Sequence, residues 1–439
     1  MTNIFFDDSL PLLVKTLTDR LGQDFVEKGT IVRDASGRLS FFSNRVANYE
    51  NEVEELTDLL EKNLGQYVRA SRPIVFSDQV GASTTLNSDQ KLPVNINGIF
   101  CYVLDRRIVG SGWLDKPEAV LANPPRIVFS TLKGGVGRST ALVIAASDLS
   151  SRGKNVLIID LDLEAPGLGD LILSPERLPT YGVIDYLVEN GLGGIPDEIL
   201  PLFIGTSELT SSSGGRVDVL PALGTKSSDN PSNVLSKLSR AMIEDITEEG
   251  SVSVSSQISG MINRIVTNNS YDVILIDCRA GLSELTAPAI LGLGATVLLF
   301  GTAQRQTIEG YRSLFSALQL LAQRDLITNS EAEWRMHLRP VYAKSSLKAA
   351  VAQQFQDDFY ELFSAHIYDK EDENASDDAL IFNRDDVNAP HWPITIAFNQ
   401  NFLDFDPSRN RGQLDSDFYE QAFRPFLNAI DGIIQETSD

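Results

Sequence analysis

A short glycine-rich stretch of this chain combines lysine, arginine and hydroxyl side chains, and that combination can bind phosphate. Glycine lets the backbone take a positive φ and approach an anion closely. The N–H groups of such a loop, and of the first turn of a following helix, point at phosphate oxygens. We therefore predict that phosphate groups bind to Lys133, Gly134, Gly135, Val136, Gly137, Arg138, Ser139 and Thr140.

A strand and a helix must hold this loop in place. An apolar, β-prone run, Ile127 to Phe129, precedes it, and a helical pattern starts at Ser139. The order strand, glycine-rich loop, helix is the context that a phosphate-binding loop needs. For the loop taken alone, an ordinary strand-to-helix turn is the alternative.

Aspartates follow two further apolar runs that are typical of buried parallel strands. Asp160 and Asp162 come after residues 156–159, and Asp277 comes after residues 273–276. Right-handed crossovers bring the carboxyl ends of parallel strands to one sheet edge, where ligands bind. Carboxylate oxygens are ligands that Mg²⁺ accepts. Strand-end turn aspartates are the alternative for each pair alone, but with the loop they predict one site.

The three motifs together resemble those of the deviant Walker A ATPases, the ParA/MinD family of P-loop proteins. The loop KGGVGRST is similar to the family's K-G-G-x-G-K-[ST]-[ST], with Lys133 as the additional lysine and Arg138 in place of the second one. The DLD at Asp160 resembles switch I, and DCRAG at Asp277 resembles Walker B with switch II. The resemblance covers roughly residues 126–346, with an extension toward the C-terminus.

This resemblance implies an ATPase that uses Mg²⁺. Ser139 would ligate the metal directly, Asp277 would act through a metal-bound water, and Asp160 would support the metal site. Asp162 would place the attacking water. Lys133 would reach the nucleotide of a second subunit, so that ATP joins a homodimer and hydrolysis separates it. The residues implied in catalysis are Lys133, Asp162 and Arg138.

Arg138 is the main departure from the family pattern. Arginine keeps the charge of lysine but is larger, planar and bidentate. Hydrolysis could therefore be slow, partner-activated or absent, and a nucleotide-sensing scaffold with little or no turnover is the alternative function. A bacterial tyrosine kinase is less favoured, because the chain has no C-terminal tyrosine cluster and no adjoining membrane segment.

Other positions leave their roles open. Arg279 stands where the family often has proline, and it could stabilise charge, bind a partner or be a surface arginine. Ala343-Lys344 matches only partly the family's Asn-Lys near the base, and no N-K-x-D guanine motif occurs, which favours ATP over GTP. Residues 304–306 lie where the family's partner or dimer contacts tend to fall.

The composition indicates a folded protein and argues against some classes of binding partner. The 439 residues include 42% hydrophobic residues, which indicates a folded chain of about two domains. The formal net charge of −23 opposes non-specific binding to DNA or to an anionic membrane. Two cysteines cannot form a disulfide scaffold, and no long apolar run or basic leader is present, so we expect a cytoplasmic protein without a membrane segment.

The expected fold is α/β, with a mostly parallel sheet and helices on both faces in residues 126–439. Residues 1–115 are predicted to form a small α+β domain that holds a protein partner, and residues 116–125 a linker. Within the first domain we expect a helix over residues 51–68 and a hairpin about Asp105-Arg106. The acidic helix near the C-terminus is expected to pack on the core rather than on a membrane.

Overall fold

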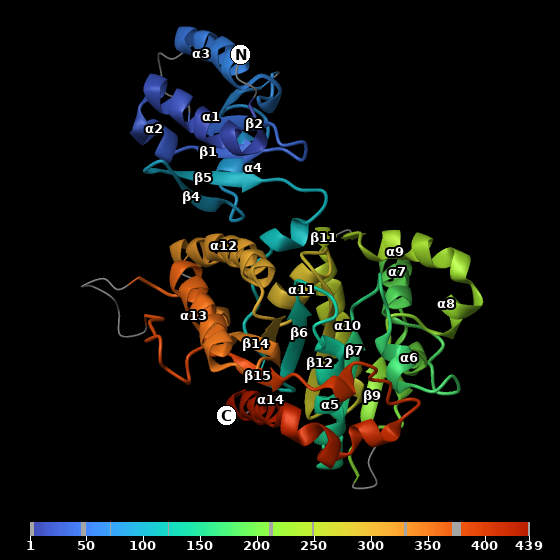
Figure 1. Ribbon diagram of the computed structural model, residues 1–439. Helices are drawn as coiled ribbons and strands as arrows, with labels where there is room; N and C mark the ends of the chain where they lie inside the picture. Colours follow the sequence, from blue (N-terminus) through green and yellow to red (C-terminus); the bar gives the residue numbers. More distant parts are fainter. Residues whose placement is uncertain are drawn as a thin grey trace. The chain divides into compact units, whose positions relative to one another are not determined.

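The structure is a computed structural model that describes residues 4–44, 50–70, 72–121, 123–209, 214–247, 250–328, 332–370 and 379–437. The chain divides into two compact units (Figure 1). One consists of Met1–Asp115 with Ala317–Ala332, and the other of Lys116–Ser316 with Glu333–Asp439. The acidic stretch at residues 371–378 lies outside the described residues.

The second unit is built on an eight-stranded sheet with the order β15-β14-β13-β6-β12-β7-β9-β8. Every neighbouring pair is parallel except β8 with β9. This confirms the predicted mostly parallel sheet. The strands are β6 (Arg126–Thr131), β7 (Val156–Asp160), β8 (Gly205–Thr206), β9 (Val217–Leu220), β12 (Val273–Ala280), β13 (Thr296–Gly301), β14 (Leu338–Ser345) and β15 (Ile394–Ala397).

Helices cover both faces of this sheet, as predicted (Figure 1). They are α5 (Arg138–Ser151), α6 (Leu168–Ile172), α7 (Val183–Gly193), α8 (Thr225–Asp229), α9 (Val234–Ala241), α10 (Val254–Asn268), α11 (Thr286–Leu291), α12 (Arg305–Ile327), α13 (Ala349–His366) and α14 (Ser416–Glu436). The helix α9 ends at Ala241, and residues 245–247 and 250–252 pair as the strands β10 and β11.

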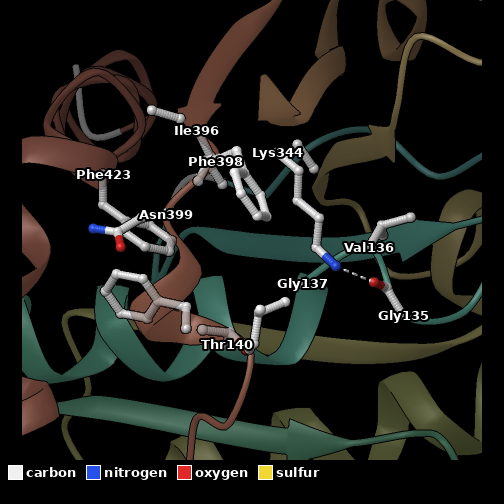
Figure 2. A pocket seen from close by; sticks show the side chains of 13 residues that line it. Gly135, Val136, Gly137, Thr140, Lys344, Ile396, Phe398, Asn399 and Phe423 are labelled. Atoms are coloured by element: carbon white, nitrogen blue, oxygen red, sulfur yellow. Dashed lines mark hydrogen bonds between the residues drawn. The ribbon is translucent and has the colours of Figure 1, made fainter. Parts of the chain in front are cut away.

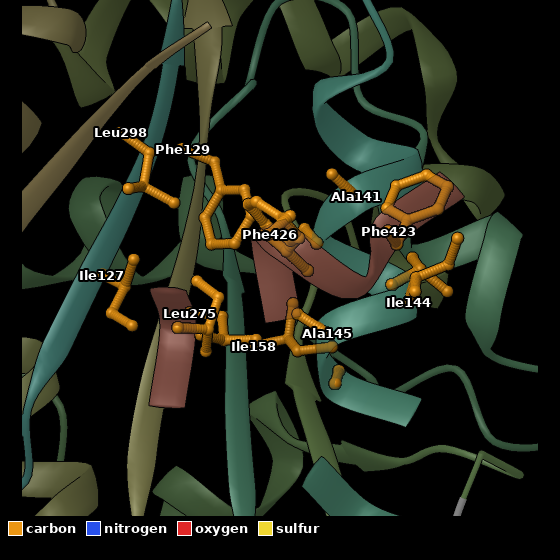
Figure 3. Close-up of a cluster of buried hydrophobic side chains, with 14 of the residues drawn as sticks. Ile127, Phe129, Ala141, Ile144, Ala145, Ile158, Leu275, Leu298, Phe423 and Phe426 are labelled. Atoms are coloured by element: carbon orange, nitrogen blue, oxygen red, sulfur yellow. The ribbon is translucent and has the colours of Figure 1, made fainter. Parts of the chain in front are cut away.

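The core beneath one sheet face explains why these elements hold together. Phe129 of β6 stacks against Phe300 of β13, and Phe426 of α14 meets both rings edge-on at 6.1 Å between ring centroids (Figure 3). Side chains of α5, including the buried Ala141 and Ile144, fill the same cluster. The helix that begins at the phosphate loop is thus fixed to the sheet by close packing.

The C-terminal helix belongs to this core. Buried side chains recur along α14 at helical spacing, and Tyr419, Phe423, Phe426 and Ile430 all join the cluster. The expectation that the helix packs on the core is therefore confirmed. Within the described residues, no helix is both long and apolar enough to span a bilayer.

The first unit is a five-stranded mixed sheet with helices. The strand order is β3-β2-β1-β5-β4. Its elements are α1 (Phe6–Leu21), α2 (Gln23–Glu27), β1 (Thr30–Arg33), β2 (Leu39–Ser43), α3 (Glu50–Leu64), β3 (Ile74–Phe76), α4 (Ala82–Leu86), β4 (Leu92–Ile96) and β5 (Ile99–Asp105). The helix expected over residues 51–68 is present as α3, which ends at Leu64, and α1, α3 and the sheet share a core that includes Leu17, Leu60 and Phe41.

One prediction for this unit was wrong. The chain does not turn back at Asp105-Arg106. Instead β5 ends at Asp105, and its antiparallel partner is the preceding β4, joined through Asn97 and Gly98. Both turn residues have positive φ, which glycine and asparagine tolerate better than other residues. The short strand LPVNI escaped notice because a proline interrupts its β pattern.

Candidate functional site

The phosphate loop forms the backbone turn that the sequence predicts. It leaves β6 at Thr131, and α5 begins at Arg138 with Gly137 as its N-terminal cap. Gly135 and Gly137 have φ values of 76° and 95°, in the left-handed region where a side chain is strained. No atom lies within 4 Å of a Cβ added at Gly134 or Gly135, so there is open space beside both glycines. This is the space that a phosphate group requires.

The strand-end acids lie beside this loop because of sheet register. Asp277 of β12 pairs with Phe129 of β6 on one side and with Asp160 of β7 on the other. The register of β12 then shifts between Asp277 and Ala280, which ends the regular pairing at this edge. The structure thus brings together the three motifs that the sequence predicted to converge.

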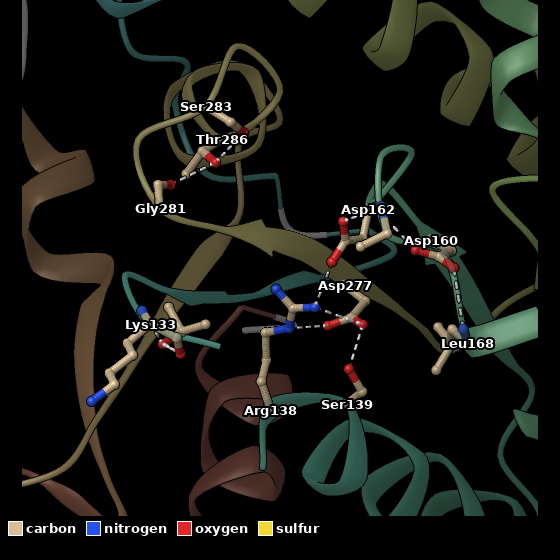
Figure 4. A network of polar contacts seen from close by, with 12 residues as sticks. Lys133, Arg138, Ser139, Asp160, Asp162, Leu168, Asp277, Gly281, Ser283 and Thr286 are labelled. Atoms are coloured by element: carbon tan, nitrogen blue, oxygen red, sulfur yellow. Dashed lines mark hydrogen bonds and ion pairs between the residues drawn. The ribbon is translucent and has the colours of Figure 1, made fainter. Parts of the chain in front are cut away.

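Arg138 is the centre of the polar network shown in Figure 4. Its Nε atom lies 2.6 Å from Oδ1 of Asp277, and its Nη2 atom donates to Oδ2 of Asp277 at 3.2 Å and to Oδ2 of Asp162 at 3.3 Å. The Ser139 hydroxyl donates to Oδ2 of Asp277 at 2.8 Å. Arg138 and Asp277 are both buried, with 9% and 2% of their surface exposed. One guanidinium therefore contacts two acids at the edge of the sheet.

Burial and charge act in opposite directions on the pKa values here. Burial raises the pKa of Asp277 to about 6, although the charge of Arg138 and the Ser139 hydrogen bond act to lower it. Burial acts to lower the pKa of Arg138, but the charges of Asp277 and Asp162 raise it above its usual value. The arginine therefore stays charged, and the ion pair is the stable state of this network.

Asp160 faces its own loop rather than Arg138. Its Oδ1 accepts from the backbone N–H of Asp162 at 3.0 Å, and its Oδ2 accepts from the N–H of Leu168 at 3.3 Å (Figure 4). These bonds shape the turn that carries Asp162. The prediction that Asp160 supports a magnesium ion stays a prediction.

The carboxyl of Asp160 should make stability depend on pH. Burial first, and then the charge of Asp277, raise its pKa to about 7 from an ordinary value near 3.8. The folded protein therefore binds the proton more tightly than the unfolded chain, and this contribution to stability is lost as pH rises from about 4 to about 7. We expect the free energy of unfolding of wild type minus that of Asp160→Asn to fall over this range, by at most about 1.4 kcal/mol per pH unit. Urea unfolding at several pH values measures this difference, and a difference that stays flat would contradict the assigned shift.

Lys133 does not take part in the Arg138 network. It is exposed, and its Nζ atom donates to Oε1 of Gln304 at 3.1 Å. Figure 4 shows its side chain directed away from Arg138. A lysine in this position is free to meet another molecule without disturbing the buried acids.

Arg279 and Cys278 do not contribute to the network either. Arg279 forms an ion pair with Glu164 in the loop after β7, and both side chains are 35% exposed. This pair links the segments after β7 and β12. Cys278 is fully buried, and burial raises the pKa of its thiol.

A pocket of about 240 Å³ adjoins the phosphate loop (Figure 2). The loop side is formed by Gly135, Gly137 and Thr140, and the opposite wall by residues after β15 together with α14. Its aromatic lining consists of Phe398, Phe402 and Phe423. The sequence does not predict this wall. The only signal was an apolar run ending in Phe398 and Asn399, and nothing in the sequence placed that run beside the loop.

Lys344 joins the pocket to the loop. Its Nζ atom donates to the carbonyl oxygen of Gly135 at 2.7 Å, and its φ of 52° is unusual for a residue other than glycine. The partial Ala343-Lys344 match therefore lies at the loop, although the asparagine of the family pattern is missing.

The residues present can hold a magnesium ion together with a nucleotide. In the described part of the chain, no group of three or more His, Cys, Asp or Glu side chains forms a metal site by itself. Mg²⁺ usually keeps several waters and takes few protein ligands besides substrate phosphates. The Ser139 hydroxyl and Asp277, in contact with each other beside the open loop, fit that pattern.

Comparison with known proteins finds a relative by sequence and several similar folds. No family model matches the chain. The chromosome-partitioning ATPase Soj of Thermus thermophilus is 26% identical over 196 residues, which is 44% of this chain and 61% of the relative. The chain thus spans less than two thirds of that relative's length. This alignment and the three motifs at one sheet edge agree. In sequence and at these motifs, the chain is similar to the ParA/MinD ATPases.

Two solved structures are also similar to this chain. The MinD cell division protein of Aquifex aeolicus has a TM-score of 0.41 at 18% identity, covering 70% of this chain and 97% of that one. A putative plasmid partition protein of Borrelia burgdorferi, bound to AMPPNP, has a TM-score of 0.40 at 18% identity, covering 70% of this chain and 100% of that one.

Proposed function

We propose that the chain is a Mg-ATP-dependent switch that hydrolyses ATP and changes its dimer state. The contact of Arg138, Ser139, Asp162 and Asp277 beside the open loop carries this proposal. An arginine and a hydroxyl at a helix N-terminus suit phosphate and magnesium, and acids at the strand ends suit metal-bound and attacking water. Positioning and charge account for most of phosphoryl-transfer catalysis, so this set of groups is sufficient in kind.

Each residue has a defined part in this mechanism. The loop amides hold the phosphates, Ser139 and Asp277 hold Mg²⁺, and Asp162 orients water toward the γ-phosphate. Arg138 stabilises phosphate charge. Bound Mg²⁺ supplies charge neutralisation at the phosphates. Lys133 reaches the nucleotide of a second copy of the chain, which its exposed position favours.

The aromatic pocket is proposed to take the base. Aromatic side chains stack on flat bases, and Phe398 offers a face that is 55% exposed. The described pocket lies within reach of the loop, because both share Gly135, Gly137 and Thr140.

Phe398→Ala should separate recognition of the base from recognition of phosphate. We expect ATP to bind about tenfold more weakly, because loss of a stacked ring costs on the order of 1–3 kcal/mol per base. Binding of inorganic triphosphate should not change, because Phe398 lies on the pocket wall rather than in the loop. Isothermal titration with both ligands measures this, and equal weakening of both would contradict the assignment of the pocket to the base.

The proposed switch is tested by ATP turnover together with mass from light scattering. Wild type should become dimeric with ATP. Asp162→Ala should slow turnover by about 100-fold and trap the dimer, because the attacking water loses its position. Lys133→Ala should remain monomeric with ATP bound. If wild type binds ATP but neither dimerises nor hydrolyses it, the switch is excluded.

That outcome would establish the second candidate, a nucleotide-sensing scaffold. One observation favours it. Asp162, the residue proposed to place water, is bound by Arg138, and an arginine that keeps this contact would hinder hydrolysis. Under either function, we propose that residues 1–115 hold a protein partner and that residues 116–125 connect the domains. We also propose that the protein is located in the cytoplasm.

A further inference from the structure

Arg138 does more in this structure than replace a lysine. Both oxygens of Asp277 already have partners: Oδ1 has the Arg138 Nε, and Oδ2 has the Arg138 Nη2 and the Ser139 hydroxyl. The residues that would bind magnesium are therefore engaged by a cation that belongs to the chain. Asp162 is engaged by the same guanidinium.

We propose that Arg138 is an internal cation that keeps Mg²⁺ out of the site until phosphate withdraws it. This inference rests on the proposed nucleotide-binding function and adds an order of events to it. Nucleotide binds first, without metal. The guanidinium then moves to the phosphate and releases Asp277 and Ser139 together, and only then does the metal bind.

The guanidinium is prepared for that transfer. Its Nη1 atom is buried and has no hydrogen-bond partner, and the contact between its Nε and Asp277 does not have hydrogen-bond geometry. A buried N–H without an acceptor costs about 1–3 kcal/mol. Phosphate offers acceptors to several guanidinium N–H groups at once, in the bidentate geometry that arginine favours. The unpaired Nη1 is thus the donor available to an arriving phosphate.

An ordinary lysine could not work in the same way. An ammonium is a compact point charge, whereas a guanidinium presents N–H groups in a fixed planar fork. The fork allows Arg138 to contact Asp277 on β12 and Asp162 in the loop after β7 while Nη1 remains available. When the Arg138 side chain moves away, Asp162 and Asp277 therefore lose their cation in the same step.

Manganese binding to the nucleotide-free protein tests the proposal, because Mn²⁺ accepts the same oxygen ligands as Mg²⁺ and is visible by electron paramagnetic resonance. We expect wild type to bind Mn²⁺ at least about tenfold more weakly than Arg138→Ala, in which the acids have lost their cation. Arg138→Lys should lie between the two and provides the comparison if the alanine variant does not fold. Arg279→Gln removes the same charge at the same sheet edge and should behave as wild type.

A second measurement uses a fluorescent ATP analogue in EDTA. Wild type should bind it without metal, and Arg138→Lys and Arg138→Ala should bind it more weakly under those conditions. Equal Mn²⁺ affinity of nucleotide-free wild type and Arg138→Lys, or an equal effect of Arg279→Gln, would overturn the proposal. Failure of wild type to bind the analogue with or without magnesium would instead overturn the proposed nucleotide function, while the manganese comparison would still decide the role of Arg138.

Discussion

Asp277→Asn should abolish most magnesium-dependent ATP turnover. Removing the charge that is proposed to hold the metal-bound water should cost several kcal/mol of transition-state stabilisation, which corresponds to about 1,000-fold in rate. The same change leaves Arg138 with only Asp162 as an ionic partner. Loss of one partner from a buried pair should lower the free energy of unfolding by about 3 kcal/mol.

An exposed pair of the same type is the control for Asp277→Asn. Arg152 contacts Asp431 at 2.8 and 3.0 Å, which is similar to the distances between Arg138 and Asp277. The side chains of Arg152 and Asp431, however, are 45% and 34% exposed. Asp431→Asn should cost less than about 1 kcal/mol, because water screens an exposed pair. Turnover assays and urea unfolding of both variants measure the contrast. Unchanged turnover in Asp277→Asn would remove this residue from the magnesium site.

Phe426→Ala should be among the most destabilising single changes in the second unit. The side chain is fully buried and contacts the rings of Phe129, Phe300 and Phe423. Truncation of such a phenylalanine costs about 3–5 kcal/mol, from lost burial and the cavity that remains. We expect the substitution to destabilise the phosphate loop as well, because side chains of α5, the helix that follows the loop, pack in the same cluster.

Thermal and urea unfolding measure the cost of Phe426→Ala, with two comparison variants. Phe426→Leu retains most of the volume and should cost less than half as much. Asn428→Ala changes an exposed residue of the same helix and should have almost no effect. If Phe426→Ala were as stable as Asn428→Ala, the C-terminal helix would not be part of the core.

The part of the site that sheet topology determines could be predicted from the sequence. Asp160, Asp162 and Asp277 follow apolar runs, and parallel strands with right-handed crossovers must end at one edge, so their convergence with the loop was predictable. The contacts of Arg138 could not be predicted from the sequence. They depend on which rotamer the guanidinium takes between two acids, and sequence spacing says nothing about rotamers. Asp160 shows the same limit, because its oxygens bind backbone N–H groups of its own turn.

Strand order explains what else was missed. The pocket wall around Phe398 follows β15, which lies beside β14 at the end of the sheet, far in sequence from the loop. No local sequence pattern indicates that the residues after β15 lie beside the phosphate loop. The hairpin of β4 and β5 was misplaced for a local reason, since the Asn97-Gly98 turn was overlooked in favour of a charged Asp-Arg pair.

The second half of α12 determines where this chain can be divided. Residues 317–332 belong to the same unit as the N-terminal 115 residues, and the Arg324 guanidinium donates to the carbonyl oxygens of Leu114 and Asp115 at 2.7 and 3.2 Å. A fragment that begins at Lys116 would keep every residue of the phosphate site. It would also leave Arg324, now 5% exposed, without those acceptors. The N-terminal unit is therefore made of two separate stretches of sequence, and expression of either part alone requires a cut through a continuous helix.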